Sequence, residues 1–325
     1  MAVREERDET VGSTRPAWFA WVVRAVAAAG LAVVVWACVT AWGAVVHGHP
    51  AYAVLLGLTA LGCVLVLWRN RRPRPARARW RRVMDVVLVV GAMVWITAMA
   101  WLRPFTAVEP ALAAMTSDSA VTVTETATEI RLAPAGEVSG TTVFFQPGAK
   151  VEARAYAAVL RPVAEAGHPV VIAKQPLGVA FLALGAFDDA RDAVPGAERW
   201  VVGGHSLGGV VASSEADAAD DDATAPVVGL LLYASYPAGD VSGSLTAAVE
   251  SVSASRDELS TPEKIDASKA DLPPDAGFTV IDGAVHAFFG DYGPQPGDGT
   301  PTISHDDARQ QISAATVTFV SGVDR

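Results

Sequence analysis

A serine enclosed by glycines has the residue type and spacing best suited to covalent chemistry in this chain. It lies in residues 204–209 (Gly-His-Ser-Leu-Gly-Gly), after the apolar run 200–202 and before a predicted helix. The G-x-S-x-G pattern predicts a sharp turn between a strand and a helix, with the serine hydroxyl exposed at its tip. Gly204 and Gly208 are expected where the strand and the helix pass too closely for a side chain. Ser206 is therefore the predicted nucleophile.

A serine hydroxyl needs a base to remove its proton, and the base is usually a histidine that a carboxylate orients. In open α/β sheets, sites form beyond the carboxyl ends of the strands. His286 follows the predicted strand 278–281 and meets this condition, whereas His168 precedes a strand. His205 is expected to point elsewhere on the serine turn. We therefore expect His286 to be the base, with His305 as the fallback.

The orienting carboxylate is expected between the serine and the histidine in chain order. Asp257 follows the predicted strand 249–253 and is the preferred acid. Asp240 follows the preceding strand and is the alternative acid. Asp271 lies in a loop next to prolines and is less favoured. The sequence thus predicts a Ser-His-Asp triad of Ser206, His286 and Asp257.

Acyl transfer through such a serine also needs N–H donors for the oxyanion of the tetrahedral intermediate. The backbone N–H of Leu207, at the start of the helix after the serine, is one expected donor. The N–H of Ala149, in the loop after the predicted strand 141–145, is the other. Gly148 would let the backbone of this loop approach a substrate.

Strands that alternate with helices must position these groups. The apolar run 227–233 is typical of a strand in a sheet covered on both faces. The spacing of the elements predicts an α/β domain with a mainly parallel sheet. Strands are predicted over residues 120–124, 129–132, 141–145, 170–173, 200–202, 227–233, 249–253 and 278–281, and helices over 155–166, 187–193 and 306–320.

The front of the chain has a different character. Residues 25–46, 51–68 and 86–102 contain no acidic or basic side chain, and 51% of the whole chain is apolar. Each run is long enough to cross the hydrocarbon core of a bilayer, which is ~30 Å thick. We predict transmembrane helices at about 25–46, 51–68 and 83–102. Residues 1–104 would form a membrane anchor, and residues 105–325 the α/β domain.

Charge predicts the orientation of this anchor. The loop 69–82 contains eight arginines, and positively charged loops stay in the cytoplasm, where they also contact anionic lipid. The amino terminus would then be cytoplasmic and residues 104 onward extracytoplasmic. Residues 1–103 have a net charge of +8 and residues 104–325 a net charge of −18. So acidic a domain would repel phosphates, which argues against a nucleic-acid partner.

Metal sites and cofactors are not expected. The pair His47 and His49 lacks a third ligand, and the acidic run 215–222 lacks the glycine and glutamate of a calcium loop. Both cysteines, Cys38 and Cys63, lie in the apolar front part. A zinc site built from cysteines is therefore excluded from the C-terminal domain.

Four stretches, residues 145–151, 203–209, 253–257 and 281–289, resemble the α/β-hydrolase superfamily. More narrowly, they are similar to the bacterial fold-5 group related to dienelactone hydrolases. The resemblance covers most of residues 140–320 and nothing before about residue 115. It implies an α/β-hydrolase fold, a Ser-Asp-His triad and hydrolysis of an ester-like bond.

Together these features predict a membrane-anchored serine hydrolase that forms an acyl-enzyme and requires no cofactor. Its expected partners are a small-molecule or lipid-like ester substrate and membrane lipids. Two alternatives stay open from the sequence. One is a non-catalytic, hydrolase-like module that binds a ligand at the membrane. The other is an acyltransferase that uses the same acyl-enzyme with an acceptor other than water.

Overall fold

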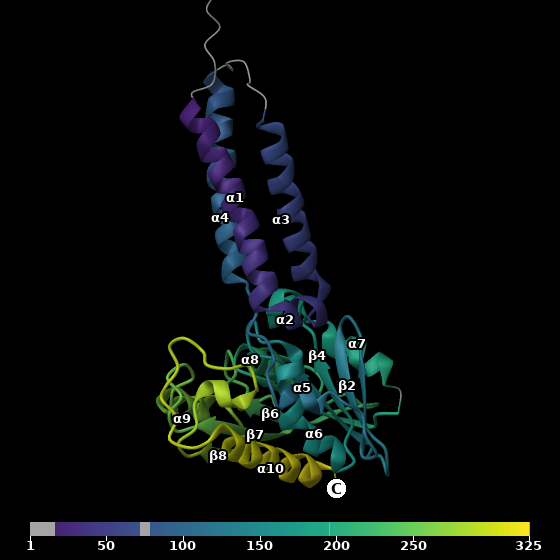
Figure 1. The fold of residues 1–325 in the computed structure, drawn as a ribbon. Helices are drawn as coiled ribbons and strands as arrows, with labels where there is room; N and C mark the ends of the chain where they lie inside the picture. Colours follow the sequence, from purple (N-terminus) through teal and green to yellow (C-terminus); the bar gives the residue numbers. More distant parts are fainter. Residues whose placement is uncertain (1–16, 72–78, 195, 325) are drawn as a thin grey trace, which may run out of the picture. The chain divides into compact units, whose positions relative to one another are not determined.

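The apolar front of the chain forms long helices in the computed structural model, which describes residues 17–71, 79–194 and 196–324 (Figure 1). Helices α1 (Ala17–Thr40), α3 (Pro50–Arg69) and α4 (Arg79–Trp101) each contain a stretch long and apolar enough to cross a membrane. Three such helices were predicted, and this part of the fold prediction is confirmed. Residues 72–78, the centre of the predicted cytoplasmic loop, lie outside the described residues.

Helix α1 begins and ends earlier than the sequence predicts. Helix α1 begins eight residues before the predicted start at residue 25 and ends at Thr40. At Ala41 the backbone leaves the helical region (φ −140°, ψ 35°), and Trp42–His47 forms a separate short helix, α2. The charge of Arg24 does not end the helix, because its guanidinium donates a hydrogen bond to the carbonyl oxygen of Asn70 at 2.9 Å.

The described chain divides into two compact units. One contains the residues up to Thr40 together with Ala53–Arg103. The other contains Ala41–Tyr52 and the chain from Pro104 onward. The connection between the first two apolar helices, including α2, therefore packs as part of the C-terminal domain.

The C-terminal domain is built on one eight-stranded sheet, with the strand order β1-β2-β4-β3-β5-β6-β7-β8. Strand β2 pairs antiparallel with β1 and with β4, and all other neighbours are parallel. This is the mainly parallel α/β sheet that the sequence predicts. The strands are β1 (Val121–Glu125), β2 (Glu129–Pro134), β3 (Thr141–Gln146), β4 (Val170–Ala173), β5 (Arg199–His205), β6 (Val227–Tyr233), β7 (Ala248–Ala254) and β8 (Gly277–Ile281).

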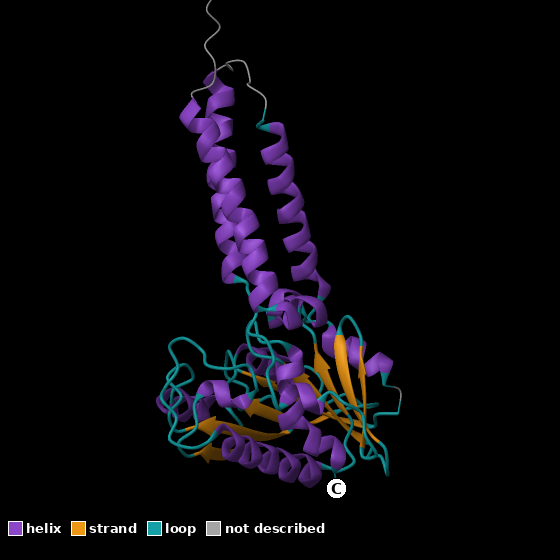
Figure 2. Cartoon of the chain, viewed as in Figure 1, coloured by secondary structure: helices purple, strands orange, loops and turns teal. Residues whose placement is uncertain are grey.

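Helices cover both faces of this sheet (Figure 2). Helices α6 (Ala157–Glu165) and α10 (His305–Val323) contribute to the core on one face, and α7 (Ala186–Ala193) and α8 (Leu207–Asp217) to the core on the other. The remaining short elements are α5 (Ala111–Ala114), α9 (Pro262–Ala267), η1 (Ala153–Tyr156), η2 (Pro176–Gly178), η3 (Ala180–Leu182), η4 (Ser268–Asp271) and η5 (His286–Phe289).

The two cores explain the unbroken apolar runs in the central strands. Along β6, Leu231 and Tyr233 belong to one core, whereas Leu230 and Leu232 belong to the other. Successive side chains of a strand point to opposite faces, so a strand covered on both sides needs apolar residues at every position. This burial holds the carboxyl ends of β5, β7 and β8 side by side at one edge of the sheet.

Candidate active site

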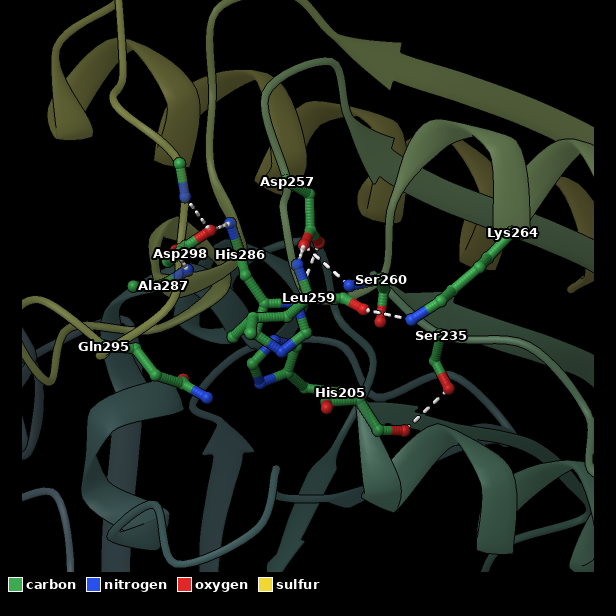
Figure 3. Close-up of polar contacts among 12 residues, drawn as sticks. His205, Ser235, Asp257, Leu259, Ser260, Lys264, His286, Ala287, Gln295 and Asp298 are labelled. Carbon is green, nitrogen blue, oxygen red and sulfur yellow. Dashed lines mark hydrogen bonds and ion pairs between the residues drawn. The ribbon is translucent and has the colours of Figure 1, made fainter.

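The predicted strand-turn-helix around Ser206 is present between β5 and α8. Ser206 has φ 51° and ψ −123°, a region that residues with a side chain rarely adopt. Such a conformation costs on the order of 1–3 kcal/mol and persists only where the surroundings enforce it. Here the N–H of Ser206 donates to the carbonyl oxygen of Tyr233 at 2.9 Å, and the Ser235 hydroxyl donates to the Ser206 carbonyl oxygen at 2.7 Å (Figure 3).

The glycines of the turn are sterically required. A Cβ atom at Gly204 would lie 2.4 Å from the carbonyl carbon of Gly208. A Cβ atom at Gly208 would lie 2.1 Å from the carbonyl oxygen of Gln146, at the end of β3. Each neighbour is backbone and cannot rotate away. Strand β5, helix α8 and the end of β3 therefore meet in direct backbone contact, which is the reason predicted for these two glycines.

His286 and Asp257 lie together in the loops after β8 and β7. The Nδ1 atom of His286 is 2.8 Å from Oδ2 of Asp257, and these residues are 1% and 2% exposed (Figure 3). The second carboxylate oxygen of Asp257 accepts hydrogen bonds from the N–H groups of Leu259 and Ser260, both at 2.7 Å. These bonds fix the carboxylate. The pairing at Nδ1 directs Nε2 of His286 to the proton chemistry, as in a serine–histidine–aspartate arrangement.

A second aspartate, Asp298, holds the backbone of the histidine loop. Its carboxylate accepts hydrogen bonds from the N–H groups of His286 at 3.1 Å, Ala287 at 2.8 Å and Gly299 at 2.8 Å (Figure 3). The first two N–H groups begin the short helix η5 and need an acceptor. The sequence prediction missed this role, because nothing in the glycine- and proline-rich segment 290–299 identifies Asp298 as a cap for a helix that precedes it.

The alternative candidates for the acid and the base make contacts away from the His286–Asp257 pair. Asp240 is exposed, and its carboxylate accepts hydrogen bonds from the N–H and hydroxyl of Ser242, so it closes its own turn. The ring of His305 stacks on Phe288 with centroids 4.4 Å apart. His168 lies just before β4, and its Nε2 atom is 3.3 Å from the hydroxyl of Ser321. The structure therefore brings Asp257, and not Asp240, to His286.

His205 does not point away from the site. Its ring centroid lies 4.5 Å from that of His286, and its Nδ1 atom lies 2.8 Å from the hydroxyl of Tyr156. The same hydroxyl accepts a hydrogen bond from the N–H of Gly148 at 2.8 Å, so Tyr156 links His205 to the loop after β3. Burial, reinforced by the nearby His286, lowers the pKa of His205 well below its usual range. His205 is therefore neutral, and Tyr156 ties the serine turn to the loop with Ala149.

The two predicted oxyanion donors lie in adjoining segments. Gly208, next to Leu207, contacts the backbone of Gln146 and Pro147, and Ala149 follows two residues later. No hydrogen-bond acceptor is found for the N–H of Leu207 or of Ala149 among the described residues. Both residues are partly exposed, as is Ser206. Two unoccupied donors beside an accessible serine are what an oxyanion would need.

A buried polar chain supports this loop from behind. The side-chain amide of Gln175 donates to the carbonyl oxygen of Pro147 at 3.0 Å and to the side chain of Gln146 at 2.9 Å. Gln146 in turn donates to Oε1 of Glu215, on α8, at 3.0 Å. Burial raises the pKa of Glu215 to about 8, against the opposing effect of the Gln146 hydrogen bond. Glu215 is consequently protonated at neutral pH.

Metal-ligating side chains do not converge in the part of the chain that the structure describes. Across residues 17–71, 79–194 and 196–324, no three His, Cys, Asp or Glu side chains are grouped so that they could hold an ion. Ser206, Asp257 and His286, the predicted nucleophile, acid and base, follow β5, β7 and β8 at the carboxyl edge of the sheet.

Comparisons with known proteins identify the family of the domain. The model of a family described as the alpha/beta hydrolase family matches residues 142–311. A search of curated proteins finds no significant match.

Solved structures with a similar fold include three lipases and esterases. A monoacylglycerol lipase from Paleococcus ferrophilus is 12% identical, with 62% of this chain and 99% of that chain covered and a TM-score of 0.47. An esterase from the Planctomycetes species Thermogutta terrifontis is 14% identical, with 62% and 91% covered and a TM-score of 0.44. A fungal esterase from Rhizomucor miehei is 14% identical, with 66% and 86% covered and a TM-score of 0.48.

The buried Glu215 makes the stability of the domain depend on pH. An unfolded glutamate titrates near about pH 4.3, whereas Glu215 in the folded chain titrates at about 8. Between these values the folded state holds a proton that the unfolded state has released. Its contribution to stability is therefore complete below the unfolded pKa and is lost as the pH rises through the folded pKa.

We expect the melting temperature of the full chain in detergent to fall between about pH 6 and pH 8. Glu215→Gln keeps an oxygen for Gln146 but cannot ionise, so its melting temperature should fall less over the same range. Asp221→Asn, an exposed acid of the same acidic region, should follow the wild type. Equal pH slopes for the wild type and Glu215→Gln would contradict this assignment.

Proposed function

Because the chain belongs to the alpha/beta hydrolase family, we propose that it is a serine hydrolase that cleaves an ester-like acyl bond with Ser206, His286 and Asp257. One observation carries this proposal. The buried His286–Asp257 pair, 2.8 Å apart, lies on the same sheet edge as a serine held in the strained turn of a nucleophile. Neither an imidazole–carboxylate pair nor such a turn is needed for packing alone.

In the proposed first half-reaction, the hydroxyl oxygen of Ser206 attacks the carbonyl carbon of the ester. His286 accepts the hydroxyl proton at Nε2, and the electron pair of the carbonyl moves onto its oxygen. The N–H groups of Leu207 and Ala149 would hold this oxyanion. Collapse of the intermediate breaks the bond to the leaving alcohol, which takes the proton from His286, and leaves an acyl group on Ser206.

In the second half-reaction, water replaces the alcohol. His286 removes a proton from the water, whose oxygen attacks the acyl carbon. The second tetrahedral intermediate then collapses, releases the carboxylic acid and returns the proton to Ser206. Asp257 stabilises the imidazolium that His286 forms in each half, and it holds the ring in one tautomer. Its burial and its two backbone hydrogen bonds suit it to this role.

We propose that the three apolar helices anchor the enzyme as a multi-pass membrane protein. The arginine-rich loop 69–82 would remain in the cytoplasm, because the cost of moving many positive charges across the bilayer is high. An odd number of spans then places the amino terminus and the hydrolase domain on opposite sides. The proposed domain therefore acts outside the cytoplasm.

Ser206→Ala should abolish the activity. We expect hydrolysis of a p-nitrophenyl ester by the full chain in detergent to fall by about 10⁴-fold or more, because no other group supplies the nucleophile. Labelling by a fluorophosphonate probe should be lost as well. Ser214→Ala, an exposed serine on the same helix, is the matched control and should keep both signals. Full activity in Ser206→Ala would instead favour a non-catalytic binding module.

Asp257→Asn and Asp240→Asn distinguish the two candidate acids. The first substitution leaves His286 without its carboxylate and favours the wrong tautomer, so kcat should fall by roughly 10⁴-fold. The second changes only an exposed turn and should leave kcat unchanged. Steady-state kinetics on the same ester provide the measurement. A large loss in Asp240→Asn with none in Asp257→Asn would reverse the assignment.

The orientation can be measured by cysteine accessibility in intact cells. Cys38 and Cys63 are first replaced by alanine, and single cysteines are then introduced at Arg71, in the basic loop, and at the exposed Asp221. A membrane-impermeant maleimide should label residue 221 from outside and residue 71 only after the cells are opened. Labelling of both positions from the same side would contradict an odd number of spans.

A further inference from the structure

The edge of the sheet that carries the proposed active site is tied to the chain that leaves the third apolar helix. The N–H of Phe105 donates to the carbonyl oxygen of Lys150 at 2.7 Å, and Phe105 forms a parallel β-bridge with Val151. The third candidate span ends at Trp101, four residues earlier. Four residues of chain span at most about 14 Å. The chain that leaves this span is therefore held at the oxyanion loop within four residues.

The connection between the first two candidate spans packs on the same edge. A Cβ atom at Gly43 would lie 3.0 Å from Oγ1 of Thr106 and 3.4 Å from the carboxylate of Glu152, so this backbone lies against both side chains. Gly43 is three residues beyond Thr40, where the first span ends. The carboxylate of Glu152 in turn accepts hydrogen bonds from the hydroxyl of Thr106 and the N–H of Ala107.

Charged side chains complete this junction. Glu125, at the end of β1, binds Arg154 and lies 2.8 Å from Nζ of Lys174, whose side chain is only 3% exposed. His47, three residues before the second span, lies 3.7 Å from the same carboxylate. All these contacts lie within one compact unit of the structure. The connection between the first two spans and the chain that follows the third are thus both held at the sheet edge that carries Ser206.

An exposed apolar loop lies on this edge, between β4 and α7. Phe181, Leu182 and Leu184 are 51%, 55% and 60% exposed. The loop flanks the oxyanion donors on two sides. The carbonyl oxygen of Gly178 accepts the hydrogen bond of the Lys150 N–H at 2.6 Å, and η3 packs against α8. Contiguous exposed apolar side chains of this size mark interaction sites.

We propose that residues 180–184 insert into the adjacent bilayer leaflet and that the substrate is a lipid ester that reaches Ser206 from the bilayer. This inference rests on the hydrolase function proposed above. Lipid is favoured over a protein partner as the occupant, because the same edge is covalently joined to three apolar spans within a few residues. Trp42 and Val46 on α2, which are 62% and 50% exposed, add apolar surface to the connection between the first two spans.

The test compares two esters on the full chain reconstituted in phosphatidylcholine vesicles. One is p-nitrophenyl butyrate, which dissolves in water, and the other is 4-methylumbelliferyl oleate, which is embedded in the vesicles. A variant with Phe181→Ser, Leu182→Ser and Leu184→Ser should hydrolyse the embedded ester about tenfold more slowly or worse. Its rate on the soluble ester should stay within about twofold of the wild type, because the oxyanion donors and the proposed triad are unchanged.

The matched control is Val138→Ser. Val138 is 58% exposed and lies before β3, at the opposite end of that strand from the oxyanion loop. It should hydrolyse both esters at the wild-type rate. An equal loss on both esters in the triple variant would make the loop a structural part of the site and overturn lipid entry. Wild-type rates on both esters in that variant would overturn it as well.

A second measurement does not depend on catalysis. A bimane fluorophore is attached to Leu182→Cys in a chain whose Cys38 and Cys63 are replaced by alanine, and brominated lipids serve as quenchers. We expect quenching at residue 182 and none at Val138→Cys. Absence of quenching at residue 182 would overturn insertion into the bilayer, even if hydrolysis that depends on Ser206 is observed. Disulfide cross-linking between unlabelled Leu182→Cys chains would then show that the loop contacts a second copy of the chain. Insertion in a chain that cleaves neither ester overturns the hydrolase function, and with it the lipid substrate.

Discussion

The contact between three backbones at Gly204, Gly208 and Gln146 is the constraint on which the site depends. Strand β5 and helix α8 approach so closely at these positions that no Cβ atom fits. The chain can reverse between them only through a residue with positive φ, and that residue is Ser206. The same contact sets the first N–H of α8 beside the loop after β3. The position of the serine, its strain and the place of both oxyanion donors thus follow from one packing requirement.

Two buried histidines, His205 and His286, are in ring contact at this edge, and each has a different polar partner. His205 lies 2.8 Å from the hydroxyl of Tyr156, and burial beside His286 keeps the pKa of His205 low, so this ring stays neutral. His286 instead faces the carboxylate of Asp257, with its Nδ1 atom 2.8 Å from Oδ2. Two adjacent imidazolium ions would repel each other. A permanently neutral His205 leaves His286 free to take up a proton during the proposed reaction.

Features that depend on nearby residues could be predicted from the sequence. The unbroken apolar run of β6 indicated a doubly covered sheet, and the two turn glycines indicated a close approach, as observed. The position of Asp257 after β7 also placed it correctly beside His286.

Features that depend on residues far apart in the chain could not be predicted. Tyr156 meets His205 across 49 positions, so the orientation of His205 was predicted wrongly. Arg24 lies inside α1, and its hydrogen-bond partner, Asn70, is 46 positions away, just after α3. Asp298 binds backbone N–H groups 11 and 12 residues before it, and no sequence pattern marks such a cap.

The ion pairs around Glu125 fix the geometry of the sheet edge that the connection between the first two spans contacts. Lys174 is almost fully buried, and a buried ammonium is tolerated only when it is paired and hydrogen-bonded. Its carboxylate partner and the carbonyl oxygen of Thr126 meet this need in a single geometry. An apolar junction could slide, because apolar packing is non-directional. A buried ion pair adds little net stability but admits few arrangements, so it suits a contact that must hold this edge of the domain in one geometry.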